Sequence, residues 1–194
     1  MDLPSAIVTC FITIFAIMDP FASLPPFLMF TKNYKKEETI KVADRAVLIA
    51  GVVAIIFMVA GPYILAALSI TLSDFRIAGG IVLVLLGIEN TLNIHLNKNK
   101  KDEGLDSAAV LIATPLLTGP GLMTSLVILN KENGITPVII ALIVSLILSL
   151  IIFRNATKVR NLLGPRIIMI FSKVMGLFLI AIGIAFIRSG MLGG

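Results

Sequence analysis

The sequence predicts an all-α integral membrane protein with six transmembrane helices in two inverted three-helix repeats, the first and fourth helices being discontinuous. Three observations support this fold class: an apolar composition, six long apolar segments, and motifs that recur at a nearly constant spacing. Apolar residues make up 58% and charged residues 14% of the 194 positions, whereas soluble domains carry about 25% charged residues. A soluble globule of this size could not keep so many apolar side chains from water, so we expect the chain to lie in a bilayer.

Six apolar segments are bounded by charges or turn residues, and a helix needs about 20 such residues to cross a membrane. They are 5–30, 46–68, 72–92, 107–129, 135–153 and 167–187. The segments leave no room for a soluble domain, so residues 1–194 are expected to form one membrane domain. Their continuous apolar runs favour helices over a β-barrel. We do not expect the first segment to be a cleaved signal peptide, because it lacks a basic start and is too long.

The basic residues indicate the topology. Thirteen of the 16 Lys and Arg residues lie in the connections after the first, third and fifth segments. Since Lys and Arg concentrate in cytoplasmic loops, we expect these connections in the cytoplasm and both termini outside, in the plasma membrane of a prokaryote. The net charge of +5 then reflects topology and gives little support for a nucleic-acid partner. A single Cys and a single His exclude an internal disulfide and Cys/His zinc sites; we expect no metal and no cofactor.

An internal repeat relates the two halves of the chain. Residues 20–25 and 115–120 both read Pro-x-x-Ser/Thr-x-Pro, at an offset of 95. A Phe-x4-Gly-x6-Gly pattern starts at Phe75 in the third segment and at Phe171 in the sixth, at an offset of 96. Two matches at nearly one offset indicate that residues of about 1–97 and 98–194 are copies. Because each copy has three spans, the second enters the membrane from the opposite face, as in secondary transporters.

Glycines recur every seventh residue in the third and sixth segments. Residues seven apart lie close to one direction on a helix, and such small residues let helices approach closely in membranes. We therefore expect these glycines to serve packing. They are Gly80, Gly87, Gly176, Gly183 and Gly190.

The proline pairs of the first and fourth segments lie near the middle of each apolar run. A proline inside a helix removes a hydrogen bond and clashes with the preceding turn. Asp19-Pro20 and Thr114-Pro115 each read as an N-cap followed by proline at the first helical position. Each span is therefore predicted to be two half-helices joined by an unwound stretch near the midplane, which must line a cavity or be buried in protein. Paired proline kinks that serve only packing are the alternative.

The chemistry of these breaks suits an amino acid zwitterion. The N–H groups that start a half-helix favour a carboxylate, and unwound carbonyl groups accept hydrogen bonds from an ammonium group. Walls formed by Ala22, Gly119 and Gly121 would favour a small side chain. The expected substrate-binding residues are Asp19, Pro20, Ala22, Ser23, Pro25, Thr114, Pro115, Thr118, Gly119, Pro120 and Gly121.

Asp19 is the only acidic residue deep in the apolar core, and ionisable groups in that position are functional candidates. It could cap the second half-helix only, take up a coupling proton, or contact the substrate ammonium group; the sequence leaves these roles open. Glu89 is expected to snorkel or to pair with a loop lysine, and Arg76, Lys173 and Arg188 to anchor span ends at the membrane interface.

Four features resemble a known family: the Met-Asp-Pro-Phe-x-Ser-x-Pro pattern of 18–25, Phe-Arg-Ile-Ala-Gly-Gly at 75–80, Thr-Pro-Leu-Leu-Thr-Gly-Pro-Gly at 114–121, and the glycine-rich sixth segment. Nearly the whole chain resembles the MarC family, also called the small neutral amino acid transporter family and related to the lysine-exporter superfamily. The resemblance implies the six-helix inverted repeat, transport of glycine, alanine and similar amino acids, and a main-chain site at the two breaks. Ala22 stands where a common family pattern has Gly.

We therefore expect a secondary transporter of small neutral amino acids, working by alternating access and coupled to an ion, a proton or exchange. A passive channel or export pore is the first alternative, because broken helices can also build a pore. An intramembrane enzyme is disfavoured, since Asp19 lacks a second deep carboxylate, and a purely structural scaffold would leave the repeated breaks unexplained. The expected partners are the amino acid and membrane lipid; a homo-oligomer is compatible with the sequence, and the direction of transport stays open.

Overall fold

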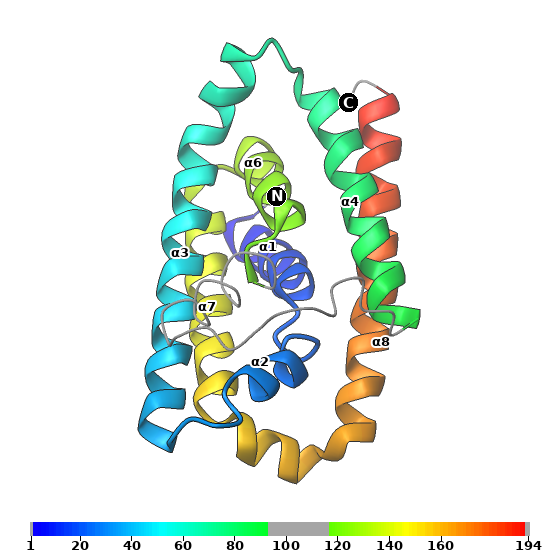
Figure 1. The fold of residues 1–194 in the computed structure, drawn as a ribbon. Coiled ribbons are helices and arrows are strands. Elements are labelled where there is room, and N and C mark those ends of the chain that lie inside the picture. Colours follow the sequence, from blue (N-terminus) through cyan, green and yellow to red (C-terminus); the bar gives the residue numbers. More distant parts are fainter. Residues whose placement is uncertain (1, 93–116, 193–194) are drawn as a thin grey trace.

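The structure is a computed structural model that describes residues 2–92 and 117–192. The described residues are helical and contain no strand, in agreement with the predicted all-α class (Figure 1). The helices are α1 (Leu3–Met18), α2 (Leu24–Phe30), α3 (Lys36–Ala67), α4 (Leu72–Leu92), α6 (Pro120–Asn133), α7 (Ile135–Arg154) and α8 (Ala156–Met191).

Four of these helices are long and apolar enough to cross a membrane: α3, α4, α7 and α8. The predicted spans at 72–92 and 135–153 agree closely with α4 and α7. The first predicted span is divided between α1, which has 16 residues, and α2, which has seven. Of the fourth, the structure describes α6, which has 14 residues. The described residues thus contain four helices of spanning length and composition rather than the six predicted.

Two helices, α3 and α8, start earlier than their predicted apolar spans, because charged residues before each span are also helical. Helix α3 begins at Lys36, ten residues before the expected apolar start, and Glu38 caps it by accepting a hydrogen bond from the Lys35 N–H at 2.7 Å. Acidic residues in a first turn also complement the helix dipole. Helix α8 begins at Ala156 and is kinked at Gly164, whose φ of 75° and ψ of 159° are not helical. A short basic segment therefore precedes the apolar part of α8.

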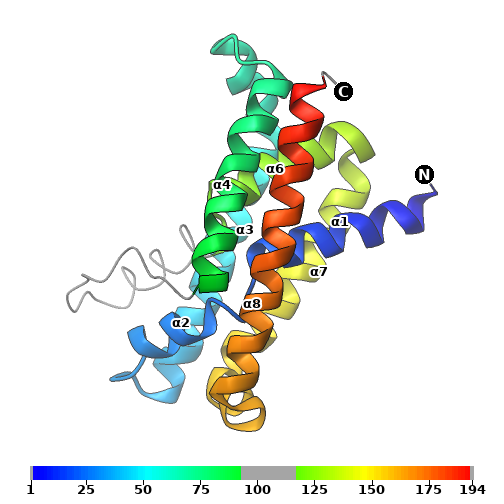
Figure 2. The same cartoon turned by 90° about the vertical axis from the view of Figure 1, so that its right-hand side faces the viewer.

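Helices α4 and α8 lie side by side and run in opposite directions (Figures 1 and 2). A Cβ atom built on Gly80 would lie 2.5 Å from the carbonyl oxygen of Gly183, and one on Gly87 would lie 2.5 Å from that of Gly176. At such distances only glycine lets the two backbones touch. The packing role predicted for the glycine stripes is confirmed.

The remaining helices form a second group, in which α7 packs against α1 and α3, and α6 packs against α3 and α4. The rings of Phe27 and Phe153 stack at 4.9 Å between α2 and α7. In Figure 1, α3 rises from the lower end while α7 descends to it. Short connections join α3 to α4 and α6 to α7 at the upper end, and α2 to α3 and α7 to α8 at the lower end.

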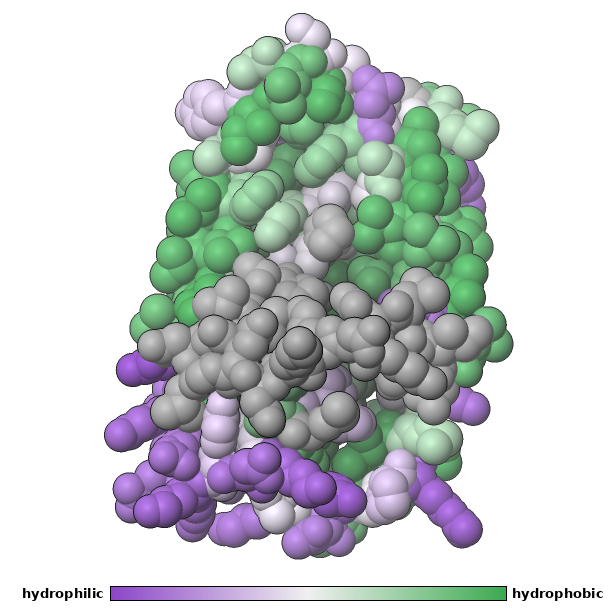
Figure 3. Space-filling model, viewed as in Figure 1, coloured by the Kyte–Doolittle hydropathy of each residue, from purple (hydrophilic) through white to green (hydrophobic). Residues whose placement is uncertain are grey.

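The surface is divided into an apolar body and a charged lower end (Figure 3). Large aliphatic side chains such as Leu48 and Leu85 are more than 60% exposed, which is expected of side chains that face lipid tails rather than water. The charged end contains the connection from α2 to α3 and the junction of α7 and α8, so two of the three basic connections share one end. The third, with Lys98, Lys100 and Lys101, lies outside the described residues.

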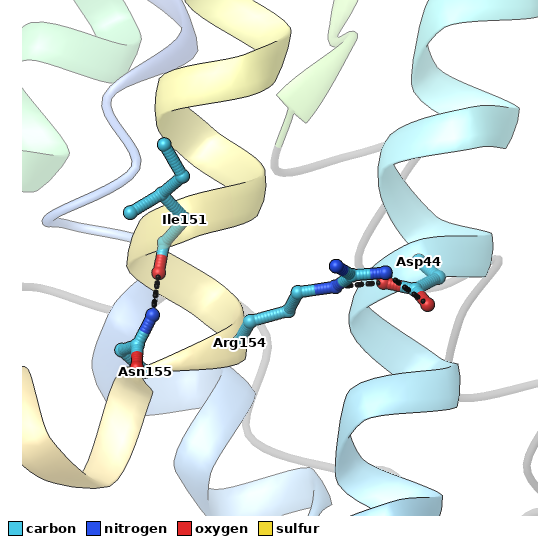
Figure 4. Close-up of polar contacts among 4 residues, drawn as sticks. All are labelled: Asp44, Ile151, Arg154 and Asn155. Carbon is cyan, nitrogen blue, oxygen red and sulfur yellow. Dashed lines mark hydrogen bonds and ion pairs between the residues drawn. The ribbon is translucent and has the colours of Figure 1, made fainter.

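One ion pair joins α3 to α7 at the charged end (Figure 4). The Arg154 guanidinium donates two hydrogen bonds to the Asp44 carboxylate, at 2.6 and 2.7 Å. The next residue, Asn155, donates from its side chain to the Ile151 carbonyl oxygen at 2.9 Å and satisfies the end of α7. Both members of the pair are exposed, so we expect a small contribution to stability.

Arg76 does not anchor a span end at the membrane surface, as the sequence suggested. It is buried and donates a hydrogen bond to the Glu132 carboxylate at 2.5 Å. The reason is tertiary: α6 packs against α4 and places an acidic side chain beside the guanidinium. Lys173 and Arg188 are exposed, as expected.

Candidate functional site

The first break separates α1 from α2 at the position that the sequence predicts. Helix α1 ends at Met18, Asp19 takes a left-handed conformation with φ 34° and ψ 68°, and α2 begins at Leu24. Proline disfavours the helical conformation in the residue before it, so Pro20 accounts for the end of α1 at this point. The sequence folds here into a turn rather than a bent helix.

Asp19 holds this turn together. Its Oδ1 accepts a hydrogen bond from the Ala22 N–H at 3.0 Å. Its carbonyl oxygen accepts two more from Ser23, one from the N–H at 3.2 Å and one from the hydroxyl at 3.1 Å. Asp19 therefore caps a turn at the end of α1. The predicted start of the second half-helix at Asp19-Pro20 is wrong, because the turn occupies Pro20 to Ser23 and α2 begins only at Leu24.

Asn90 is a member of the site that sequence reasoning missed. It lies in the last turn of α4, and its side-chain N–H donates to Asp19 Oδ2 at 3.2 Å across 71 positions of the chain. A polar residue at the end of an apolar span is an ordinary interfacial feature, so the pattern gave only a weak signal. The contact ties α4 to the break and gives both carboxylate oxygens of Asp19 a partner.

The break is buried in the protein, with a cavity beside it. Asp19 is 4% exposed, and Pro20 and Ser23 are also buried. Ala22, Pro25 and Asn90 line a cavity of about 640 Å³. This volume lies within the range of small-molecule pockets. The unwound stretch thus packs into protein and borders a cavity, which is the setting that non-helical backbone needs inside a membrane.

The second break is described from Leu117 onward, and Thr114 and Pro115 lie outside the described residues. Thr118 is fully buried, and Gly119 precedes α6, with Pro120 as its first residue. The Gly119 carbonyl oxygen accepts hydrogen bonds from the N–H groups of residues 122 and 123, at 2.9 and 3.2 Å. This is a helix start with proline at the first position, but it lies five residues after the start predicted at Thr114-Pro115.

Gly121, at the end of the second break, packs against α4. A Cβ atom on Gly121 would lie 2.6 Å from a Leu83 methyl group, so Gly121 serves the contact of α6 with α4. The described lining includes Ala22 and Pro25 and does not include Thr118, Gly119 or Gly121. That both breaks enclose one pocket therefore stays a prediction.

These features define a helical, polytopic integral membrane protein with a buried acidic break next to a cavity. The family comparison is consistent with this class: a model described as "MarC family integral membrane protein" matches residues 4–193. The chain belongs to the MarC family, which confirms the resemblance seen in its motifs.

The relatives come from archaea and bacteria. UPF0056 membrane protein MJ1677 of Methanocaldococcus jannaschii is 33% identical over 203 residues, which cover 100% of this chain and 98% of the relative. A UPF0056 membrane protein of Archaeoglobus fulgidus is 29% identical, with 93% and 90% covered. UPF0056 inner membrane protein YhgN of Escherichia coli is 29% identical, with 90% of each chain covered. No solved structure matches the chain.

Proposed function

We propose that the chain is a secondary transporter of small neutral amino acids such as glycine and alanine, working by alternating access around the first break. One observation carries the proposal: a buried carboxylate, Asp19, caps an interrupted span beside a cavity that Ala22 and Asn90 line. A buried ionisable group at an interrupted membrane helix is typical of a substrate or ion site. Transport needs no catalytic residue, and we propose that the protein is not an enzyme.

The contacts between helices support two inverted repeats. Exchange of the halves at an offset of 96 turns the contact of Gly80 with Gly183 into that of Gly176 with Gly87, which is also present. The same exchange relates the packing of α2 on α8 to that of α6 on α4. The paired helices α3 and α7, and α4 and α8, run in opposite directions, as a two-fold axis in the membrane plane requires (Figure 1).

The chemistry of the breaks supports a small zwitterion. An ammonium group beside Asp19 would donate hydrogen bonds to the Asp19 carboxylate in place of those it donates to water. Ala22 and Asn90 already hold this carboxylate in position. The start of α6 at Gly119 and Pro120 would favour a carboxylate through its N–H groups. We propose that the other residues predicted at the breaks shape this site, with the charged end of the molecule in the cytoplasm and both termini outside.

Flux into liposomes tests the proposal. Purified protein is reconstituted, and uptake of labelled glycine, alanine and leucine is measured with and without unlabelled amino acid inside. We expect saturable uptake of glycine and alanine, acceleration by internal amino acid, and little leucine uptake. No flux of any small neutral amino acid would refute the proposal, and flux that neither saturates nor exchanges would instead favour a pore.

A matched pair of variants tests the role of Asp19. Asp19→Asn keeps the size of the side chain and removes its charge, so we expect loss of uptake or of its dependence on a proton gradient. Asp44→Asn makes the same change at an exposed residue of the charged end and should leave uptake nearly unchanged. Equal uptake by both variants would mean that Asp19 only caps the turn and takes no part in transport.

A further inference from the structure

The cavity beside the first break is a groove between one face of α2 and one face of α8. From α2 and the residues after it come Leu24, Leu28 and Lys32, spaced at multiples of four. From α8 come Ile168 and Met169 together with Arg160, which lies before the kink. The middle of the groove is thus aliphatic, and its two cations lie in the segments that lead toward the charged end.

The kink in α8 belongs to the construction of this groove. Gly164 has a φ of 75° and a ψ of 159°, a conformation that residues with a side chain adopt at a cost. Pro165 follows and also lines the cavity. The kink at these two residues lies between Arg160 and Ile168. Both of these residues line the cavity, one from each side of the kink.

Neither cation is neutralised within the described part of the chain. Lys32 and Arg160 are exposed, form no ion pair among residues 2–92 and 117–192, and share the described lining with no Asp or Glu. The other described polar side chains of the lining, Asn90 and Ser172, are neutral. The groove therefore combines a positive potential with an aliphatic wall.

We propose that this groove binds an anionic membrane lipid, whose phosphate group lies between Lys32 and Arg160 and whose acyl chain lies along Leu28, Ile168 and Met169. Basic pockets between membrane helices on the cytoplasmic side suit such headgroups. The cations belong to the charged end, next to the apolar body of the molecule (Figure 3), which is the level of lipid headgroups. A cavity of about 640 Å³ is also far larger than glycine or alanine requires.

Native mass spectrometry tests this proposal directly. Delipidated protein in a neutral detergent is titrated with phosphatidylglycerol or with phosphatidylcholine of the same acyl chains, and the bound fraction is measured. We expect tighter binding of phosphatidylglycerol. The double variant K32Q/R160Q should weaken it about fivefold for each cation removed, or roughly 25-fold together.

Two control variants separate the groove from general basic charge. K36Q/K158Q removes two exposed cations of the same end that do not line the cavity, and it should bind phosphatidylglycerol like the parent protein. K32R/R160K keeps both charges and should retain most of the binding. Equal loss in K32Q/R160Q and K36Q/K158Q, or no preference for the anionic lipid, would overturn the proposal.

A second arm distinguishes a lipid from a free anion. Thermal unfolding in detergent is measured with inorganic phosphate and with phosphatidylglycerol at equal phosphate concentration. The lipid should raise the melting temperature and phosphate alone should not, because phosphate leaves the aliphatic wall empty. An equal rise with phosphate alone would identify a free-anion site and contradict the proposal. Neither measurement depends on amino acid transport, so this inference and the proposed function fail separately.

Discussion

The contact between α4 and α8 makes a quantitative prediction about one methyl group. In Gly80→Ala the new Cβ would lie 2.5 Å from the Gly183 carbonyl oxygen, about 0.9 Å inside ordinary van der Waals contact at 3.4 Å. The obstacle is backbone, so no side-chain rotation relieves it. The helices must separate, and overpacking of this kind costs about 1–3 kcal/mol.

Gly51→Ala provides the matched control. Gly51 lies inside α3, and its new Cβ would meet only the end of the Leu146 side chain, at 3.1 Å, which can rotate away. Both variants gain the same helix propensity, about 1 kcal/mol, so this gain cancels when they are compared. The difference in unfolding free energy should therefore be about 1–3 kcal/mol, with Gly80→Ala the less stable.

Thermal unfolding of the two purified variants in one detergent measures this difference. For a chain of this length, 1 kcal/mol corresponds to about 2–4 °C in melting temperature. Gly80→Ala should thus melt about 2–12 °C below Gly51→Ala. Equal melting temperatures, or the reverse order, would refute the close backbone contact between α4 and α8.

Three further predictions concern other parts of the fold. Gly164→Ala should lower stability by about 1–3 kcal/mol although nothing lies within 4 Å of the new Cβ, because its φ of 75° is strained; unchanged thermal unfolding would contradict this. The exposed pair of Arg154 and Asp44 should show only a small coupling in a double-mutant cycle, and high salt should weaken it further; a large coupling that resists salt would be inconsistent with exposure. Asn90→Ala should cost about 1–3 kcal/mol in unfolding free energy and lose most of that effect when Asp19 is already Ala; additive losses would mean that the two side chains do not interact.

The local features of the fold could be predicted because they depend on neighbouring residues. Pro20 ends α1 through its effect on the preceding residue alone, without any tertiary contact. Glycines seven apart identify a smooth helix face even when the helix that packs on it is not known. The prediction of the break in the first span and of the packing stripes needed only these local rules.

Contacts between distant residues could not be predicted in the same way. Asn90 meets Asp19 across 71 positions, and Arg76 meets Glu132 across 56. Neither pair shares a helix face or a motif, so no periodicity links its members. The charged start of α3 at Lys36 was also missed, because hydropathy marks the membrane-embedded part of a helix and not its full length.

The central claim is that substrate occupies the cavity beside the first break, and labelling at Ala22 tests it most directly. Cys10 is the only cysteine, so Ala22→Cys in a Cys10→Ala background carries one thiol, on the lining of the cavity. In oriented vesicles we expect a membrane-impermeant thiol reagent to reach this residue from the charged end, and glycine or alanine, but not leucine, to slow the reaction. A thiol that reacts at the same rate with and without glycine or alanine would contradict the proposed site.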